Sequence, residues 1–159
     1  MARALIVGLI SDTHGLLRPE ALDLLRGSDF ILHAGDVGNP QILEELARLA
    51  PVTAVRGNID SAGWAQSLPE HDVLEVDPRT RLYVLHRIED LDLEPATAGY
   101  HAVIFGHSHK PSNYRKDGVL YVNPGSAGPR RFALPISVGR LHVQEGGVSV
   151  ELIEIERKG

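Results

Sequence analysis

Two histidines one residue apart, His107 and His109, follow an apolar run that ends at Gly106. Imidazole nitrogens at the end of a strand are typical ligands of a divalent metal ion. A single pair of this kind is weak support, because exposed and core histidines are common. The pair gains weight only if other ligand-type side chains occupy equivalent positions elsewhere in the chain.

Four more strand-like apolar runs end directly at side chains of the same kind. In open α/β sheets, the loops that follow several strands converge beyond the carboxyl ends of those strands. We therefore expect the side chains at these positions to meet in one pocket. The set is Asp12, His14, Asp36, Asn58, His86, His107 and His109.

The donor types define the chemistry that such a pocket permits. Carboxylates, imidazoles and one amide oxygen, without thiolates, favour manganese, iron or zinc over copper(I) or an iron–sulfur cluster. Seven ligands are too many for one tetrahedral ion and suit two ions that share a bridging carboxylate. Two cations about 3.5–4 Å apart can clamp both oxygens of an in-line phosphoryl displacement and hold a bridging hydroxide as nucleophile. The residues therefore predict hydrolysis of phosphate esters.

Composition places the chain among ordinary soluble globular proteins. Its 159 residues suit one domain, residues 1–159, and 43% of them are hydrophobic. The absence of cysteine excludes disulfides, thiolate zinc sites and cysteine nucleophiles. A net charge of -5 argues against a protein that binds a nucleic-acid polymer over a broad surface. Since no apolar run approaches the roughly 20 residues of a membrane span, we expect a cytoplasmic protein without membrane association.

The elements that must position these side chains alternate in the first half of the chain and are mostly strands in the second half. Predicted helices at 19–27 and 39–50 separate strand-like runs at 4–10, 30–34 and 52–55. This order implies a parallel sheet with right-handed crossovers. Later elements are a short helix at 95–99 and strands at 72–76, 81–85, 102–105, 112–116, 119–123, 136–144 and 148–155. We expect an α/β fold of two packed sheets flanked by helices, the first mainly parallel and the second carrying the C-terminal hairpins.

Considered together, the motifs resemble those of the calcineurin-like metallophosphoesterase superfamily in order and spacing. The residues that carry the resemblance are Ser11-Asp12-Thr13-His14-Gly15, Gly35-Asp36-Val37-Gly38, Gly57-Asn58-Ile59-Asp60, His86, Gly106-His107-Ser108-His109 and Asn123-Pro124-Gly125-Ser126. They are specific jointly, although each alone is weak. The chain looks like the small bacterial and archaeal phosphodiesterase branch, which also contains the eukaryotic retromer subunit of the same fold.

The resemblance implies a four-layer α/β/β/α sandwich of two mixed sheets flanked by helices. The metal ligands that it implies are Asp12, His14 and His109 for a first ion, Asp36 as a bridge, and Asn58, His86 and His107 for a second. It further implies a metal-dependent hydrolase acting on a small phosphodiester, with Asp36, Asn58 and His107 taking part in catalysis. Both ions are expected to be manganese, with iron, zinc or nickel as alternatives, and a homo-oligomer is left open.

Two positions depart from the pattern of the superfamily. Ile59 stands where many members have a histidine that helps to bind the phosphate or to protonate the leaving group. Arg87 follows His86 where many relatives have glycine, and it either contacts substrate or points to solvent. Since the retromer subunit also lacks the first histidine, a second hypothesis is a non-catalytic interaction scaffold of the same fold.

Three further features near the motifs have two interpretations each. His33, in the strand that leads to Asp36, either orients a neighbouring ligand or is a plain core histidine. Asp60 either hydrogen-bonds a ligand or caps the following turn, with the cap favoured. The segment from Asn123 to Ser126 either lines the site through its backbone, as the resemblance favours, or is a turn that leaves a strand.

Overall fold

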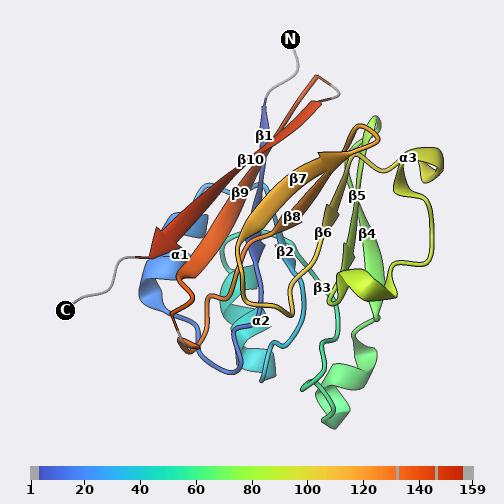
Figure 1. Cartoon of the computed structure of the whole chain (residues 1–159). Coiled ribbons are helices and arrows are strands. Elements are labelled where there is room, and N and C mark those ends of the chain that lie inside the picture. The colour runs from blue at the N-terminus through green and yellow to red at the C-terminus, as the bar shows by residue number, and fades with distance from the viewer. Residues whose placement is uncertain (1–3, 132, 146, 156–159) are drawn as a thin grey trace.

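The computed structural model describes residues 4–131, 133–145 and 147–155, which form two facing five-stranded sheets (Figure 1). The first sheet contains β1 (Leu5–Ile10), β2 (Phe30–His33), β3 (Val52–Ala54), β9 (Ile136–Gln144) and β10 (Gly147–Ile155), in the order β10-β9-β1-β2-β3. The second contains β4 (His71–Asp77), β5 (Thr80–Leu85), β6 (Ala102–Ile104), β7 (Ser112–Lys116) and β8 (Val119–Asn123), in the order β4-β5-β6-β8-β7. The predicted turn residue Gly146 lies outside the described residues.

The alternating first half of the chain folds as predicted. β1, β2 and β3 are parallel neighbours, connected through α1 (Pro19–Leu25) and α2 (Pro40–Ala47). Helix α2 begins where the sequence indicates, because the side chain of Asn39 accepts a hydrogen bond of 3.3 Å from the N–H of Ile42 and proline occupies the first turn. Parallel pairing brings the carboxyl ends of all three strands to the same edge of the sheet.

The hairpin of β9 and β10 belongs to the first sheet, so the prediction that the second sheet carries both C-terminal hairpins was wrong. β9 pairs antiparallel with β1, with Leu5 opposite Val143 and Leu9 opposite Gly139. Turn residues and alternation predict the local pairing of two strands, but they do not indicate which free edge the pair joins. The hairpin of β7 and β8 lies in the second sheet, as expected. Both sheets are therefore mixed.

Three apolar clusters hold the layers together. Between the sheets, Leu9 and Leu32 of the first pack with Leu82 and Ile104 of the second. A second cluster packs α1 and α2 against the outer face of the first sheet, and contains Leu25, Ile31 and Leu46, among others. Together with two short 3-10 helices, η1 (Gly63–Ser67) and η2 (Ile88–Asp90), these layers give the α/β/β/α sandwich implied by the resemblance.

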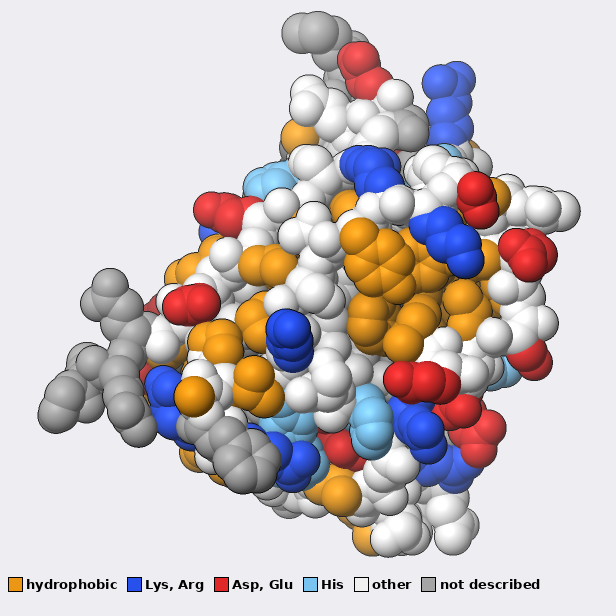
Figure 2. Space-filling view, viewed as in Figure 1, with side chains coloured by type: hydrophobic (Ala, Val, Ile, Leu, Met, Phe, Trp, Pro, Cys, Tyr) orange, Lys and Arg blue, Asp and Glu red, His pale blue; other side chains and the backbone are white. Residues whose placement is uncertain are grey.

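The outer layer on the second sheet is thin. It consists mainly of η2 and α3 (Pro95–Ala98), which lie beyond the sheet on the side away from α1 and α2 (Figure 1). Figure 2 shows hydrophobic side chains at the surface over β7 and β8. There Tyr114, 45% exposed, stacks on Tyr121 with ring centroids 5.0 Å apart. No described helix has the length and the apolar run that a membrane span requires.

Candidate metal centre

The predicted ligands come from both sheets and meet where the strands end. Asp12 Oδ1 lies 3.4 Å from His109 Nε2, 3.8 Å from His14 Nε2 and 3.9 Å from His86 Nε2. Asp36 Oδ2 lies 3.2 Å from His86 Nε2 and 3.5 Å from His14 Nε2. The structure therefore brings five of the seven predicted side chains into direct proximity.

These five side chains form two overlapping groups whose possible ligand atoms lie within 4.8 Å of one another. One group is Asp12, His14 and His109, and the other is Asp12, Asp36 and His86. Asp12 belongs to both groups, and Asp36 approaches one imidazole of each. Both carboxylates thus lie between the groups, whereas the resemblance implied a bridge by Asp36 alone.

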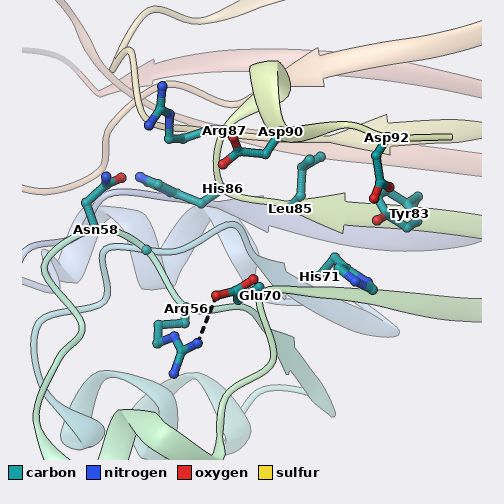
Figure 3. Close-up of a pocket in the computed structure, with 11 residues that line it drawn as sticks. Arg56, Asn58, Glu70, His71, Tyr83, Leu85, His86, Arg87, Asp90 and Asp92 are labelled. Carbon is teal, nitrogen blue, oxygen red and sulfur yellow. Dashed lines mark hydrogen bonds and ion pairs between the residues drawn. The ribbon is translucent and has the colours of Figure 1, made fainter.

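Asn58 and His107 are exposed at the rim, and among the described histidines and carboxylates His107 belongs to neither compact group. The ring of His107 meets the ring of His86 edge-on, with centroids 5.2 Å apart. The side chain of Asn58 points toward that of His86 (Figure 3). The two residues are placed near the centre, and their ligand roles stay predictions.

Left-handed backbone is concentrated at the predicted ligands. Positive φ values occur at Asp12 (55°), His14 (47°), Asp36 (55°), His107 (75°) and His109 (64°). The other two non-glycine residues of the described chain with positive φ, Asp117 and Glu145, lie in hairpin turns. Such a conformation costs on the order of 1 kcal/mol per residue and persists where surrounding contacts impose it. Its clustering here indicates a functional site.

Two glycines allow the strand ends to approach closely. A Cβ at Gly106 would collide with the Ser11 hydroxyl and with the Asp12 carboxylate. A Cβ at Gly57 would collide with the backbone and the carboxylate of Asp36. Both glycines are therefore needed for steric reasons, and Gly106 in particular allows a loop of the second sheet to contact a loop of the first.

Electrostatics keep the two carboxylates ionised. Burial would raise the pKa of Asp12, but the imidazoles of His109 and His14 hold this pKa well below its usual range. Burial would also raise the pKa of Asp36, which His86 and the N–H of Ile59 lower instead. Conversely, burial would lower the pKa of His86, but the nearby carboxylates of Asp36 and Asp12 raise it. The centre is thus a buried anionic site surrounded by imidazoles.

The residues fit a divalent cation. Asp12 Oδ1 and His86 Nε2 are buried and have no hydrogen-bond partner among the described residues, although they face one another at 3.9 Å. A buried carboxylate oxygen without a donor is costly. A cation that prefers oxygen and nitrogen ligands would satisfy both atoms, and the donor set suits manganese, iron or zinc.

Asp60 has a role that neither interpretation of the sequence described. Its carboxylate accepts hydrogen bonds from the N–H groups of Gly57 (2.9 Å), Gly38 (3.0 Å) and Val37 (3.1 Å). It therefore ties the loop after β2 to the loop after β3. The motif Gly57-Asn58-Ile59-Asp60 gave no signal for this, because the partners at Val37 and Gly38 are distant in the chain.

The segment from Asn123, the last residue of β8, to Ser126 supports the ligand loops through side chains. Asn123 Nδ2 donates to Gly106 O and to Ser108 Oγ, both at 3.1 Å. Ser126 Oγ donates to Asp12 O at 3.0 Å. The resemblance favoured lining by the backbone of this segment, whereas these contacts brace the loops that carry Asp12 and His107.

A cavity of about 370 Å³ opens beside Asn58 and His86 (Figure 3). Its lining is mostly polar and comprises Arg56, Gly57, Asn58, Glu70, His71, Tyr83, Leu85, His86, Arg87, Asp90 and Asp92. Arg56 forms an ion pair of 3.1 Å with Glu70, whereas Arg87 lies 3.8 Å from Glu89. The cavity therefore holds two cationic side chains and three carboxylates next to the candidate centre.

Comparison with known proteins identifies the family of this chain. The profile of the calcineurin-like phosphoesterase superfamily domain matches residues 5–146, so the chain belongs to this superfamily. A probable metallophosphoesterase of Methanothermobacter thermautotrophicus is 34% identical over an aligned length of 164 residues. The alignment covers 94% of this chain and 92% of that protein.

Two solved structures show the same fold. An archaeal phosphodiesterase superposes with a TM-score of 0.76 at 22% identity, covering 94% of this chain and 100% of the other. Vps29 of Entamoeba histolytica, solved as a complex with Zn²⁺, superposes with a TM-score of 0.71 at 23% identity, covering 94% and 99%. Proteins with different names thus share this fold, so function has to be inferred from the residues of the site.

Proposed function

We propose that this protein is a dinuclear metal-dependent phosphodiesterase that hydrolyses small phosphodiesters. The observation that carries the proposal is the convergence of Asp12, Asp36 and three imidazoles on two overlapping groups, with buried ligand atoms left unpaired. Two ionised carboxylates give the site the negative charge that a pair of divalent cations would neutralise. The similarity to a probable metallophosphoesterase along nearly the whole chain supports the same function.

The proposed ligand roles keep the assignment that the resemblance to the superfamily implies. We assign Asp12, His14 and His109 to one ion, and Asn58, His86 and His107 to the other, with Asp36 between them. When bound, two such cations would supply Lewis acidity and would activate water for the hydrolysis of a phosphate ester. Asp36 orients the imidazoles of His14 and His86, which it approaches within 3.5 Å and 3.2 Å. In addition to holding their ion, His107 and Asn58 would contact the phosphoryl oxygens, because both side chains are exposed at the rim.

The cavity beside Asn58 and His86 would hold an organic group of the substrate. Its volume of about 370 Å³ suits a small molecule. Arg87, which follows His86, provides a cation at this wall, while the net charge of -5 disfavours a long polyanion. We therefore propose a small phosphodiester as substrate. We also propose manganese as the preferred ion and the cytoplasm as the location.

The test is hydrolysis of bis(4-nitrophenyl) phosphate by protein stripped of metal and then supplied with manganese. We expect turnover that requires the added ion and that is lost in Asp36→Asn and His107→Ala. His142→Ala is a matched control, because this imidazole is 41% exposed on β9, where it lies 4.0 Å from Glu151. Absence of turnover above buffer with manganese, iron, zinc and nickel would refute the proposal.

The second candidate function is an interaction scaffold of the same fold. Ile59 favours it, since this exposed apolar side chain can neither bind a phosphate nor donate a proton. Metal content alone does not separate the two functions, because a Vps29 of this fold was solved with Zn²⁺. Turnover separates them: a scaffold would bind ions and leave the diester intact.

A further inference from the structure

His33, the last residue of β2, connects the two loops that carry Asp12 and Asp36. Its side chain is fully buried and is not one of the candidate ligands. Its Nδ1 lies 3.1 Å from the N–H of Gly35, and its Nε2 lies 3.0 Å from Thr13 Oγ1. Thr13 Oγ1 in turn lies 2.8 Å from Val37 O. These three contacts form one continuous chain of hydrogen bonds.

The chain has a single consistent assignment of protons. The backbone N–H of Gly35 can only donate, so Nδ1 of His33 accepts. The carbonyl of Val37 can only accept, so the Thr13 hydroxyl donates its hydrogen there and accepts from Nε2 of His33. The imidazole is therefore neutral with its proton on Nε2. Burial lowers the pKa of His33 to about 4, in agreement with a neutral ring at physiological pH.

The partners of His33 flank the candidate ligands directly. Thr13 lies between Asp12 and His14, while Gly35 and Val37 lie on either side of Asp36. Backbone hydrogen bonds also join the two loops, with Asp12 N 3.0 Å from Gly35 O and His14 N 2.9 Å from Asp36 O. The imidazole adds a buried side-chain link between the same loops. Loss of this link would leave the N–H of Gly35 and the hydroxyl of Thr13 without these partners.

We propose that His33 is a positioning residue, which sets the placement of the Asp12 and Asp36 carboxylates and thereby the affinity of the centre for a divalent cation. It acts through Thr13 and Gly35 and contacts neither cation nor substrate. The inference rests on the proposed function only in that the centre binds cations. If His33 merely filled the core, an aromatic ring of similar volume could replace it without loss of cation affinity.

The experiment is calorimetric titration of metal-free protein with manganese, after circular dichroism has shown that each variant is folded. His33→Phe retains a ring and removes both hydrogen bonds, whereas His33→Gln retains a donor toward Thr13. We expect affinity to fall about 10- to 100-fold in His33→Phe, and less in His33→Gln. Wild-type affinity in a folded His33→Phe variant would overturn the inference.

Thr13 provides an independent test should His33→Phe fail to fold. Thr13→Val removes the hydroxyl that receives the Nε2 proton, and Thr13→Ser retains it. We expect weaker manganese binding in the valine variant only, and equal affinities would overturn the inference. In the metal-free wild type, ¹⁵N spectra of the His33 ring should show the Nε2–H tautomer, and an Nδ1–H tautomer would contradict the assignment. Manganese binding without turnover would refute the proposed function and leave this inference intact.

Discussion

The Nε2 atoms of His14 and His109 lie 3.3 Å apart, although one follows a strand of the first sheet and the other a strand of the second. Asp12 Oδ1 approaches both of these nitrogens, at 3.8 Å and 3.4 Å. Two ring nitrogens that face each other at this distance can share one proton or coordinate one cation. Coordination would join the two sheets through a single ion.

Metal binding should therefore stabilise the fold. At a manganese concentration 100 times the dissociation constant, linkage contributes about 2.7 kcal/mol, which for this chain length raises Tm by roughly 5–10 °C. We expect this rise in wild type and in the control His142→Ala, and none or little in His109→Ala. Calorimetric melts with manganese and with a chelator measure it, and an equal rise in His109→Ala would contradict the role of that imidazole.

Gly106→Ala should disturb the centre from outside the ligand set. The added methyl group would meet Ser11 and Asp12, so the loops must separate at a cost of about 1–3 kcal/mol. Gly63→Ala is the matched control, because a Cβ there meets nothing within 4 Å. Urea unfolding and manganese titration of the two variants provide the comparison. Gly106→Ala with the stability and affinity of Gly63→Ala would show that the close approach is unimportant.

Most of the fold could be predicted because it depends on local patterns. The predicted strand ranges agree with β1 to β8 within one or two residues, and Pro19 and Asn39 indicate where helices start. The pairing of β9 with β1 in the first sheet could not be predicted, since local turn and alternation signals do not indicate which sheet a hairpin joins. Ligand types at strand ends predicted the five side chains that meet, whereas the ligand roles of Asn58 and His107 stay predictions. The braces from Asp60 and Asn123 were missed, because hydrogen bonds between loops depend on spatial neighbours rather than on spacing.

Acid should destabilise the metal-free protein partly through His33. Its pKa falls from 6.5 to about 4 on folding, so the unfolded chain takes up this proton first as pH falls. The free energy of unfolding is therefore unaffected by this group above about pH 6.5 and declines below it, by about 2 kcal/mol between pH 7 and pH 5. Chemical denaturation across this range should show a steeper loss in wild type than in His33→Gln. Parallel curves for the two proteins would contradict the assigned pKa.

Ile59→His should improve hydrolysis where the leaving group needs a proton. Ile59 is 48% exposed and its N–H donates to Asp36 Oδ1 at 3.0 Å, so an imidazole there would reach the rim of the centre. A general acid is typically worth 10² to 10⁴ in rate, and we expect about a tenfold gain or more with methyl phenyl phosphate. Methyl 4-nitrophenyl phosphate, with its better leaving group, should gain little. Ile59→Phe is the control, and a gain in that variant would argue against proton transfer.

The left-handed backbone at five candidate ligands has a consequence for how this fold diversifies. Backbone hydrogen bonds join the loops of Asp12, His14 and Asp36, so their contour does not depend on the imidazoles of the candidate ligands. Exchange of a few side chains would then abolish hydrolysis while the rim kept its shape. A descendant of such an enzyme would inherit a ready-made, rigid concave surface on which another macromolecule could be recognised.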